Sequence, residues 1–140
     1  MSDSAETVVQ AFVRAINRQD ANDLASLMSE EHRFIDSLGH SVVGRERMRA
    51  GWESYFRMVP DYTIEVDETL TDGPVVVMLG TAQGTYRDPA KGNEVLLERE
   101  NRWSTPAVFR AFIEGGKISE WRVYADNEPI RKLMAKKQRS

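Results

Sequence analysis

The sequence predicts an α+β domain in which helices gather on one face of a curved antiparallel sheet. Apolar residues recur at helical spacing through the first part of the chain, up to Pro60. Beyond Pro60 they alternate with polar residues, as in strands that have one wet face. Turns rich in glycine and proline then divide the rest of the chain into short segments. Helices first and hairpin-connected strands afterwards are typical of this class.

The first helix is expected to begin at Asp3, whose side chain caps it while Glu6 reaches back. Its buried face contains Val8, Val9, Phe12, Val13 and Ile16. Asp20 is expected to cap a second short helix, which has Asp23 in its first turn. The buried stripe of that helix contains Leu24, Leu27 and Met28. The two helices therefore form a hairpin.

A third helix is expected to open at Gly44 and to stop at Pro60. It follows a short strand-like run, Phe34-Ile35-Asp36. Its apolar face is unusually aromatic and contains Met48, Trp52, Tyr55, Phe56 and Val59.

The second part of the chain is predicted to be mostly sheet. Alternating apolar residues, Tyr62, Ile64 and Val66, predict the first long strand. Four more strands are expected between Val75 and Ala125, in an antiparallel meander. Turn signals separate them at positions 88–93, 106 and 115–116. A short terminal helix is expected from Pro129.

The composition suits one domain spanning residues 1–140, since 41% of the residues are apolar and 29% are charged. The chain has no cysteine, which excludes disulfides, thiolate metal ligands and a cysteine nucleophile. A net charge of -3 provides no basic footprint for nucleic acid. The longest apolar run, Val75 to Leu79, is too short to cross a membrane, and the N-terminus lacks a secretory pattern. We therefore expect a soluble cytoplasmic protein that binds neither nucleic acid nor membrane.

Asp36 is the first candidate for a catalytic residue. It interrupts an apolar run between Phe34 and Gly39. Burial beside apolar groups disfavours the charged form of an acid and brings its pKa nearer to that of a useful general base. The alternative is an aspartate that faces water or caps the turn at 37–39.

His32, Asp36 and His40 have side chains of the kinds that bind zinc or iron. Four-residue steps bring side chains together on a helix, whereas this segment is predicted to be strand and turn. No metal and no other cofactor is therefore expected. Both histidines are expected at the surface or in a turn.

The chain resembles the SnoaL-like and ketosteroid-isomerase-like proteins of the nuclear-transport-factor-2-like superfamily over nearly its whole length. The resemblance rests on Val8 to Val13 followed by Asn17 to Asp20, on Phe34 to Asp36 ahead of Gly44, and on Gly116 to Tyr124. It implies a cone-shaped α+β barrel with an apolar cavity, in which the curved antiparallel sheet packs on the N-terminal helices. It does not imply one reaction, because the architecture also carries cyclases, epoxide hydrolases, dehydratases and binding proteins.

Two comparisons within the superfamily suggest roles for single residues. Asp36 falls where ketosteroid isomerases keep the aspartate that moves a proton, whereas Phe12 and Val108 occupy the positions of the two donors for the enolate oxygen. In the comparison with limonene-epoxide-hydrolase-like members, Arg99 matches the arginine that flanks an aspartate there. Asn101 and Val123 replace the two acids that hold water in those members. Neither the classical steroid isomerase reaction nor epoxide hydrolysis is therefore expected.

The sequence leaves Arg99 two interpretations. Arg99 and Asn101 share one face if their segment is a strand, where the arginine would orient a carbonyl or carboxylate. Alternatively, Arg99 forms an external ion pair with Glu98 or Glu100. The parity of the strand decides between them.

The residues expected to bind a ligand are Phe12, Ile16, Phe34, Trp52, Tyr55, Phe56, Tyr62, Trp103, Val108, Trp121 and Val123. The small residues Gly80, Ala82 and Gly84 would leave room for a ligand, or the glycines mark a bulge or bend of the sheet.

Two functions stay open. One is a cofactor-independent isomerase, cyclase or dehydratase in which Asp36 acts as base on an apolar substrate, helped by a donor such as Arg99, Asn101, Tyr55 or Tyr62. The other is a non-catalytic binding or accessory protein for a small hydrophobic molecule. A homodimer formed through the outer face of the sheet is compatible with both.

Overall fold

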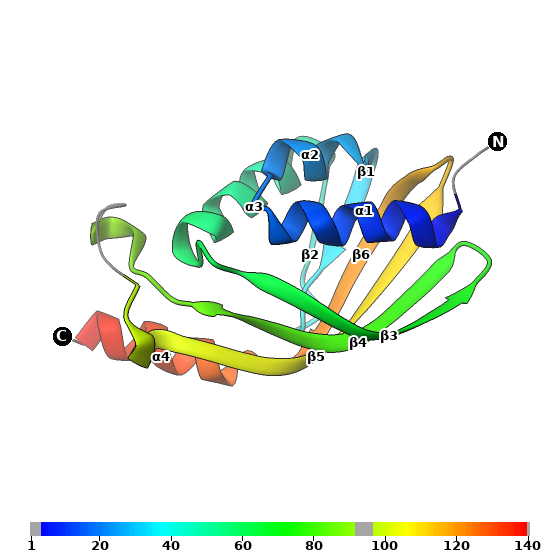
Figure 1. The fold of residues 1–140 in the computed structure, drawn as a ribbon. Coiled ribbons are helices and arrows are strands. Elements are labelled where there is room, and N and C mark those ends of the chain that lie inside the picture. The colour runs from blue at the N-terminus through cyan, green and yellow to red at the C-terminus, as the bar shows by residue number, and fades with distance from the viewer. Residues whose placement is uncertain (1–3, 92–96, 140) are drawn as a thin grey trace.

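The computed structural model describes residues 4–91 and 97–139, which form four α-helices and one six-stranded sheet (Figure 1). The helices are α1 (Ala5–Asn17), α2 (Ala21–Ser26), α3 (Arg45–Met58) and α4 (Glu128–Arg139). The strands are β1 (Met28–Ile35), β2 (Ser41–Val43), β3 (Thr63–Asp72), β4 (Val75–Thr85), β5 (Arg102–Glu114) and β6 (Lys117–Ala125). Two short 3-10 helices, η1 (Pro89–Lys91) and η2 (Arg99–Asn101), lie between β4 and β5. The predicted α+β class is confirmed.

The helical layer lies on one side of the curved sheet. Figure 1 shows α1, α2 and α3 above the strands, while α4 lies beside β5. The buried residues of α1 are Val8, Val9, Phe12, Ala15 and Ile16. Ala15 takes the place predicted for Val13, which is only partly buried. The core therefore lies between these helices and the inner face of the sheet.

The helix starts follow from local capping chemistry. The side chain of Ser4 accepts a hydrogen bond from the Thr7 amide and caps α1. The expected cap, Asp3, lies outside the described residues. Asp20 caps α2 as predicted, with Oδ1 accepting from the Asp23 amide at 2.9 Å. Gly44, at φ 119°, precedes α3.

The sheet is mixed and open, which corrects the expectation of a purely antiparallel sheet. Its strand order is β2-β1-β6-β5-β4-β3, so β2 and β3 are its two edges. β3, β4, β5 and β6 form the predicted antiparallel meander. β1, however, runs parallel to β6, a pairing between segments that are distant in the sequence. Local turn signals contain no information about that pairing.

Pro106 does not divide two strands, as the turn signal predicted, but lies within β5. It pairs with Thr81 on β4. β6 ends at Ala125, opposite Ala107, so β5 has no strand neighbour on that side at Pro106. Proline is tolerated at such an edge because no ladder hydrogen bond is lost. Three strands rather than four therefore occupy the region from β4 to β6.

Gly80 and Gly84 allow the close approach of neighbouring backbone and side chains. A Cβ atom at Gly80 would lie 1.8 Å from the carbonyl oxygen of Glu65, next to the register shift between Val66 and Glu68. A Cβ atom at Gly84 would lie 2.3 Å from Cγ1 of Val59. The bulge interpretation is therefore supported at Gly80, whereas Gly84 makes room for the Val59 side chain.

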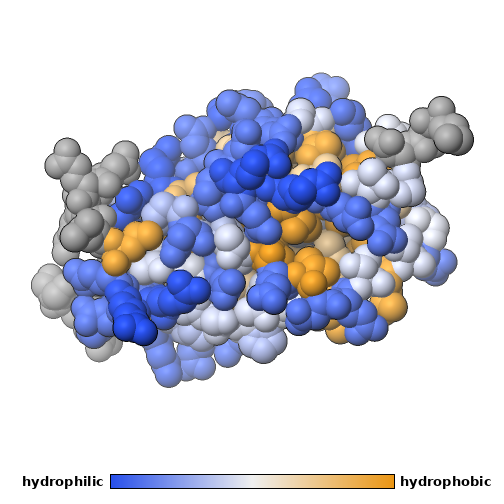
Figure 2. Space-filling view, in the orientation of Figure 1, coloured by the Kyte–Doolittle hydropathy of each residue, from blue (hydrophilic) through white to orange (hydrophobic). Residues whose placement is uncertain are grey.

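The visible face of the molecule is largely hydrophilic, with apolar residues showing through in its middle (Figure 2). None of the helices in the described ranges is long and apolar enough to cross a membrane.

Candidate functional site

An apolar cavity of about 350 Å³ lies where the helical layer meets the inner face of the sheet. This volume is at the lower end of the range that is usual for small-molecule sites. The lining residues are Phe34, Asp36, Ser37, Val42, Met48, Gly51, Trp52, Tyr55, Tyr62, Ala82, Trp103, Thr105, Val123, Ala125 and Asn127. Asp36 is the only carboxylic acid in this set, which contains no lysine, arginine or histidine.

The side-chain periodicity of each helix and strand determines which of its residues line the cavity. On α3, Met48, Trp52 and Tyr55 share the face that a spacing of four and three residues produces. On β5, Trp103 and Thr105 belong to the alternating buried set that faces the helices. Residues two apart on β6 complete the wall on the same side of the sheet.

Asp36 directly follows β1, and its two carboxylate oxygens have different contacts. Its Oδ1 accepts hydrogen bonds from the amides of Leu38 and His40, each at 2.9 Å. Its Oδ2 lies 3.6 Å from Nδ1 of His40, and the Asp36 side chain is 36% exposed. The turn-capping interpretation is therefore confirmed for one oxygen, while the side chain also lines the cavity. This exposure is greater than the sequence predicted.

Four aromatic side chains form a continuous group along the wall. The Tyr55 and Tyr62 rings meet edge to face, with centroids 5.0 Å apart and an interplanar angle of 89°. The Tyr62 ring lies between those of Trp52, at 6.4 Å, and Trp103, at 6.1 Å. Burial raises the pKa values of both tyrosines, and the nearby Tyr55 also raises that of Tyr62. Both phenols therefore stay protonated and are hydrogen-bond donors at neutral pH.

The polar atoms of this aromatic group have no hydrogen-bond partner among the described residues. Within the described chain, no hydrogen bond is made by the Tyr55 or Tyr62 hydroxyl. The Nε1 atoms of Trp52 and Trp103 are buried, and among the described residues they also lack an acceptor. An unsatisfied buried donor costs roughly 1–3 kcal/mol. The aromatic part of the wall therefore offers donors, while Asp36 is the one carboxylate of the lining.

The structure brings together one group of the predicted site residues, namely Phe34, Asp36, Trp52, Tyr55, Tyr62, Trp103 and Val123. Four others, Phe12, Ile16, Phe56 and Trp121, are core residues outside the cavity lining. The aromatic ones pack on neighbouring rings; Phe12 and Trp121, for example, have centroids 4.7 Å apart. Helical spacing identified buried residues but could not distinguish core from cavity.

Three predicted residues lie away from the cavity. Val108 is on the outer face of β5, because the buried set of that strand contains Ala107 and Phe109. Arg99 and Asn101 belong to η2 rather than to a strand, so they do not share a strand face. Arg99 is exposed, whereas Asn101 is buried, and neither lines the cavity.

Several lining residues were missed by sequence reasoning. They are Ser37, Val42, Met48, Gly51, Thr105, Ala125 and Asn127, whereas Ala82 was expected only to leave room for a ligand. Ser37 ties the β1–β2 turn to the sheet, since its Oγ accepts from the Ala125 amide at 3.2 Å. Thr105 could have been predicted, because it lies two residues after Trp103 and so on the same face of the strand. No sequence signal places Ser37 beside Ala125.

His32 is fully buried, which corrects the expectation of a surface or turn histidine. Burial lowers its pKa, while its hydrogen bond to the Ile118 carbonyl and the charge of Glu120 oppose that shift. His40 lies exposed in the turn, as predicted. In residues 4–91 and 97–139, no three or more histidine, aspartate or glutamate side chains cluster to hold a metal ion.

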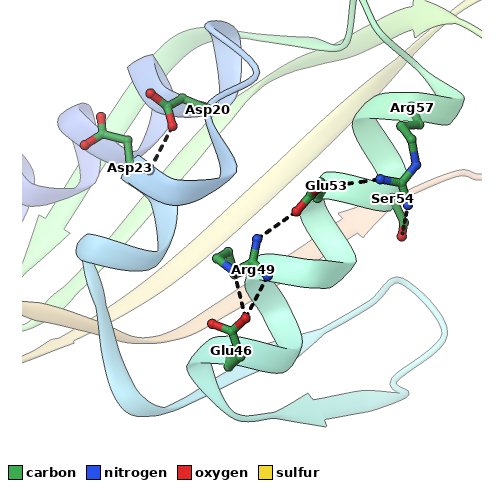
Figure 3. A network of polar contacts seen from close by, with 7 residues as sticks. All are labelled: Asp20, Asp23, Glu46, Arg49, Glu53, Ser54 and Arg57. Carbon is green, nitrogen blue, oxygen red and sulfur yellow. Dashed lines mark hydrogen bonds and ion pairs between the residues drawn. The ribbon is translucent and has the colours of Figure 1, made fainter. Parts of the chain in front are cut away.

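A second, polar hollow of about 760 Å³ lies between the α1–α2 turn and α3. Figure 3 shows the ion pairs beside it, in which Arg49 contacts Glu46 and Glu53, each at 2.7 Å, on the same helix. The Glu46 and Glu53 side chains are 77% and 51% exposed. Such solvent-exposed pairs contribute little to stability. The apolar cavity is therefore the stronger candidate for a ligand site.

A sequence profile described as the SnoaL-like domain matches residues 9–121 of the chain. No curated protein sequence matches this chain significantly.

Solved structures share the fold at low sequence identity. A protein from Shewanella denitrificans OS-217, proposed to be a SnoaL-like polyketide cyclase, is 14% identical with a TM-score of 0.77, over 94% of this chain and 97% of that one. The AclR protein of Streptomyces galilaeus, proposed to be a hydroxylase, is 18% identical with a TM-score of 0.72, over 94% and 81% of the two chains. A protein with a ketosteroid isomerase-like fold from Catenulispora acidiphila DSM 44928, in complex with trimethylamine, is 18% identical with a TM-score of 0.68, over 84% of this chain and 83% of that one.

Proposed function

This chain belongs to the SnoaL-like domain family, and we propose that it binds a compact, largely apolar molecule in the cavity and moves a proton on it with Asp36 as general base. The reaction is of the isomerase, cyclase or dehydratase type, in which a proton leaves a carbon next to a carbonyl. The fold relationship to proteins proposed to be polyketide cyclases supports this class of chemistry. No cofactor takes part in the proposed step.

The observation that carries the proposal is the geometry of Asp36. Two backbone amides bind Oδ1 and hold the carboxylate of this lining residue in one orientation. Oδ2, which lies 3.6 Å from Nδ1 of His40, is the proposed basic atom. The other polar side chains of the lining are neutral. A carboxylate that is both oriented and next to an apolar space supports the role of general base that we propose for it.

The proposed partner of Asp36 is a hydrogen-bond donor elsewhere in the cavity lining. General-base assistance contributes about 10²- to 10⁴-fold, so a donor to the developing enolate oxygen is also needed. Tyr55 and Tyr62 suit this role because burial keeps their phenols protonated and their hydroxyls lack partners among the described residues. Arg99 and Asn101, the other candidates from the sequence, lie outside the lining.

The second candidate function is binding without turnover. It is favoured by Phe12, an apolar core residue at the position that the resemblance assigns to one of the two steroid-isomerase donors. Val108 lies on the outer face of β5, so it cannot stand at the position of the second donor. The relative that holds trimethylamine supports small-molecule binding in this fold, although that ligand is a property of the relative.

Hydrogen–deuterium exchange tests the proposal without knowledge of the natural substrate. 2-Tetralone is a compact apolar ketone, and NMR in D₂O follows the loss of protons at the carbons beside its carbonyl. We expect the protein to accelerate this exchange and Asp36→Asn to reduce the acceleration by about 10²-fold or more. Asparagine keeps an oxygen for the Leu38 and His40 amides but removes the basic atom.

Asp67→Asn is the matched control, because Asp67 is an exposed carboxylate on β3 outside the lining. It should leave exchange unchanged. Equal exchange by the wild type and Asp36→Asn would exclude Asp36 as the base. Saturable binding of 2-tetralone with no exchange above buffer would favour the binding function instead.

A further inference from the structure

His32 lies on β1, four positions before Asp36, at a break in the pairing between β1 and β6. Met28 pairs with Ile118 and Arg33 pairs with Glu120, so β1 advances five residues while β6 advances two. An irregularity of this kind interrupts the ladder and re-aims the side chains that follow it. The side chains that follow this one are Phe34 and Asp36, which both line the cavity.

The His32 side chain spans this break. Its Nδ1 lies 2.7 Å from the carbonyl oxygen of Ile118. A carbonyl can only accept, so Nδ1 carries the proton and donates. The Ile118 amide in turn donates to the Leu27 carbonyl at 2.8 Å, which anchors the start of β1 on the same residue of β6. The imidazole therefore supplies a strand-to-strand hydrogen bond where the backbone ladder is interrupted.

The His32 backbone makes a second connection. Its carbonyl oxygen accepts from the amide of Gly44 at 2.8 Å, and Gly44 is the residue from which α3 begins. The helix α3 contributes Met48, Trp52 and Tyr55 to the cavity. His32 thus connects β6, the end of β1 and the start of α3.

From these contacts we infer that His32 is a positioning residue for the cavity. Its Nδ1–H bond to Ile118 sets how far the end of β1 lies along β6, and hence where Asp36 stands relative to the wall of α3. This inference rests on the proposed function for the role of Asp36, but the position of the Asp36 turn can be measured independently of catalysis.

A role in core packing does not account for this histidine. The side chain is 0% exposed and packs near the Phe12 ring, at a centroid distance of 6.3 Å. Its Nε2 is buried, and no described residue provides a hydrogen-bond partner for it. A phenylalanine or leucine would fill such a space without burying an unpaired nitrogen. The directed Nδ1–H bond is therefore the feature that distinguishes histidine from an apolar residue here.

Two substitutions of His32 test whether the hydrogen bond to Ile118 matters, or only the presence of a polar side chain. His32→Asn places an amide nitrogen near the position of Nδ1, so it can still donate to Ile118. His32→Gln carries the same amide group one carbon farther out, near the position of Nε2. Val76→Ala controls for general destabilisation, because Val76 is a fully buried residue of β4 away from β1 and α3.

The first readout is the NMR position of the Leu38 and His40 amides, which bind Asp36. We expect His32→Gln to shift both resonances, His32→Asn to leave them near their wild-type positions, and Val76→Ala to leave them unchanged. The second readout is 2-tetralone exchange. We expect a loss of about 10-fold or more for His32→Gln and near wild-type exchange for His32→Asn, since small misplacements of a catalytic group reduce rates strongly.

The inference is overturned if His32→Gln leaves both amide resonances in place, or if the Gln and Asn variants shift them equally. It is also overturned if Val76→Ala produces the same shifts, because the effect would then come from lost stability. If the wild-type protein does not accelerate 2-tetralone exchange, the general-base proposal fails. The shifts of the Leu38 and His40 amides then still decide the role of His32. If His32→Gln does not fold, the Asn variant still tests the bond, since it should retain the wild-type amide positions.

Discussion

Asp36 is a carboxylate whose two oxygens have different environments. Two amides bind Oδ1, whereas Oδ2 makes no hydrogen bond with a described residue and lies 3.6 Å from Nδ1 of His40. The same turn geometry that makes aspartate common after a strand thus orients an acid at the cavity. Capping of the turn and the proposed role as general base therefore both require an aspartate at position 36.

The buried His32 predicts a dependence of stability on pH. Burial lowers its pKa in the folded protein below the value of 6.5 that it has when exposed. The unfolded chain then binds more protons than the folded chain between the two pKa values, so acid favours unfolding. The stabilisation is fully present above pH 6.5 and is lost progressively as the pH falls toward the lowered folded pKa.

We therefore expect urea unfolding to show a free energy that declines from about pH 7 to pH 5. His32→Asn lacks the titrating group, so its decline over this interval should be smaller. His40 is present in both proteins, and the difference between them isolates His32. The nearby Glu120, which opposes the pKa shift, is also unchanged. Parallel pH profiles for the two proteins would contradict the prediction.

Individual strands depend on close backbone contacts that only glycine permits. Gly80 on β4 faces the backbone of β3, where a Cβ would lie 1.8 Å from the Glu65 oxygen. The neighbour is main chain within a paired strand, so it cannot rotate away. This contact accompanies the register shift between Val66 and Glu68 and helps to bend the sheet.

Gly80→Ala is accordingly expected to destabilise the protein by about 2 kcal/mol or more, because overpacking forces the strands apart. Gly51→Ala is the matched control. Gly51 lies in the middle of α3, where an added Cβ would meet only Met48 atoms at 3.9 Å and beyond. Alanine there should stabilise the helix by roughly 0.5–1 kcal/mol. Urea unfolding measures both, and effects of the same sign would refute this account.

The molecule as a whole presents an open sheet whose outer face is not covered by α1, α2 or α3 (Figure 1). Val77, Leu79, Val108 and Phe112 of β4 and β5 lie on this face and are half-buried. Arg110 pairs with Glu120 beside them at 2.8 Å. An apolar sheet face of this kind is suited to pairing with a second copy of the chain.

We predict a homodimer formed through this outer face, with twice the 16.0 kDa mass of the chain by light scattering. Val108→Lys should place a charge at the interface and shift the protein to the monomer. Leu97→Lys replaces a residue that is 43% exposed but lies in the connection before η2, and should leave the mass unchanged. A wild-type protein that is monomeric at micromolar concentration would contradict the prediction.

The sequence by itself determined the local features of this protein. Helical spacing and capping side chains predicted α1, α2 and α3, because the hydrogen bonds and side-chain contacts of a helix join residues that are close in the chain. Alternation predicted the meander, and an acid in an apolar run identified Asp36. The aromatic face of α3 predicted Trp52 and Tyr55 of the lining.

Only the tertiary structure decided which buried residues form the core and which line the cavity. Phe12 and Trp121 have the same sequence signature as Trp52 and Trp103, yet only the latter two line it. The parallel pairing of β1 with β6 depends on contacts between residues far apart in the chain, which no local period encodes. That pairing also buries His32 beside Ile118 and brings Ser37 to Ala125, because the register between distant strands determines which side chains meet.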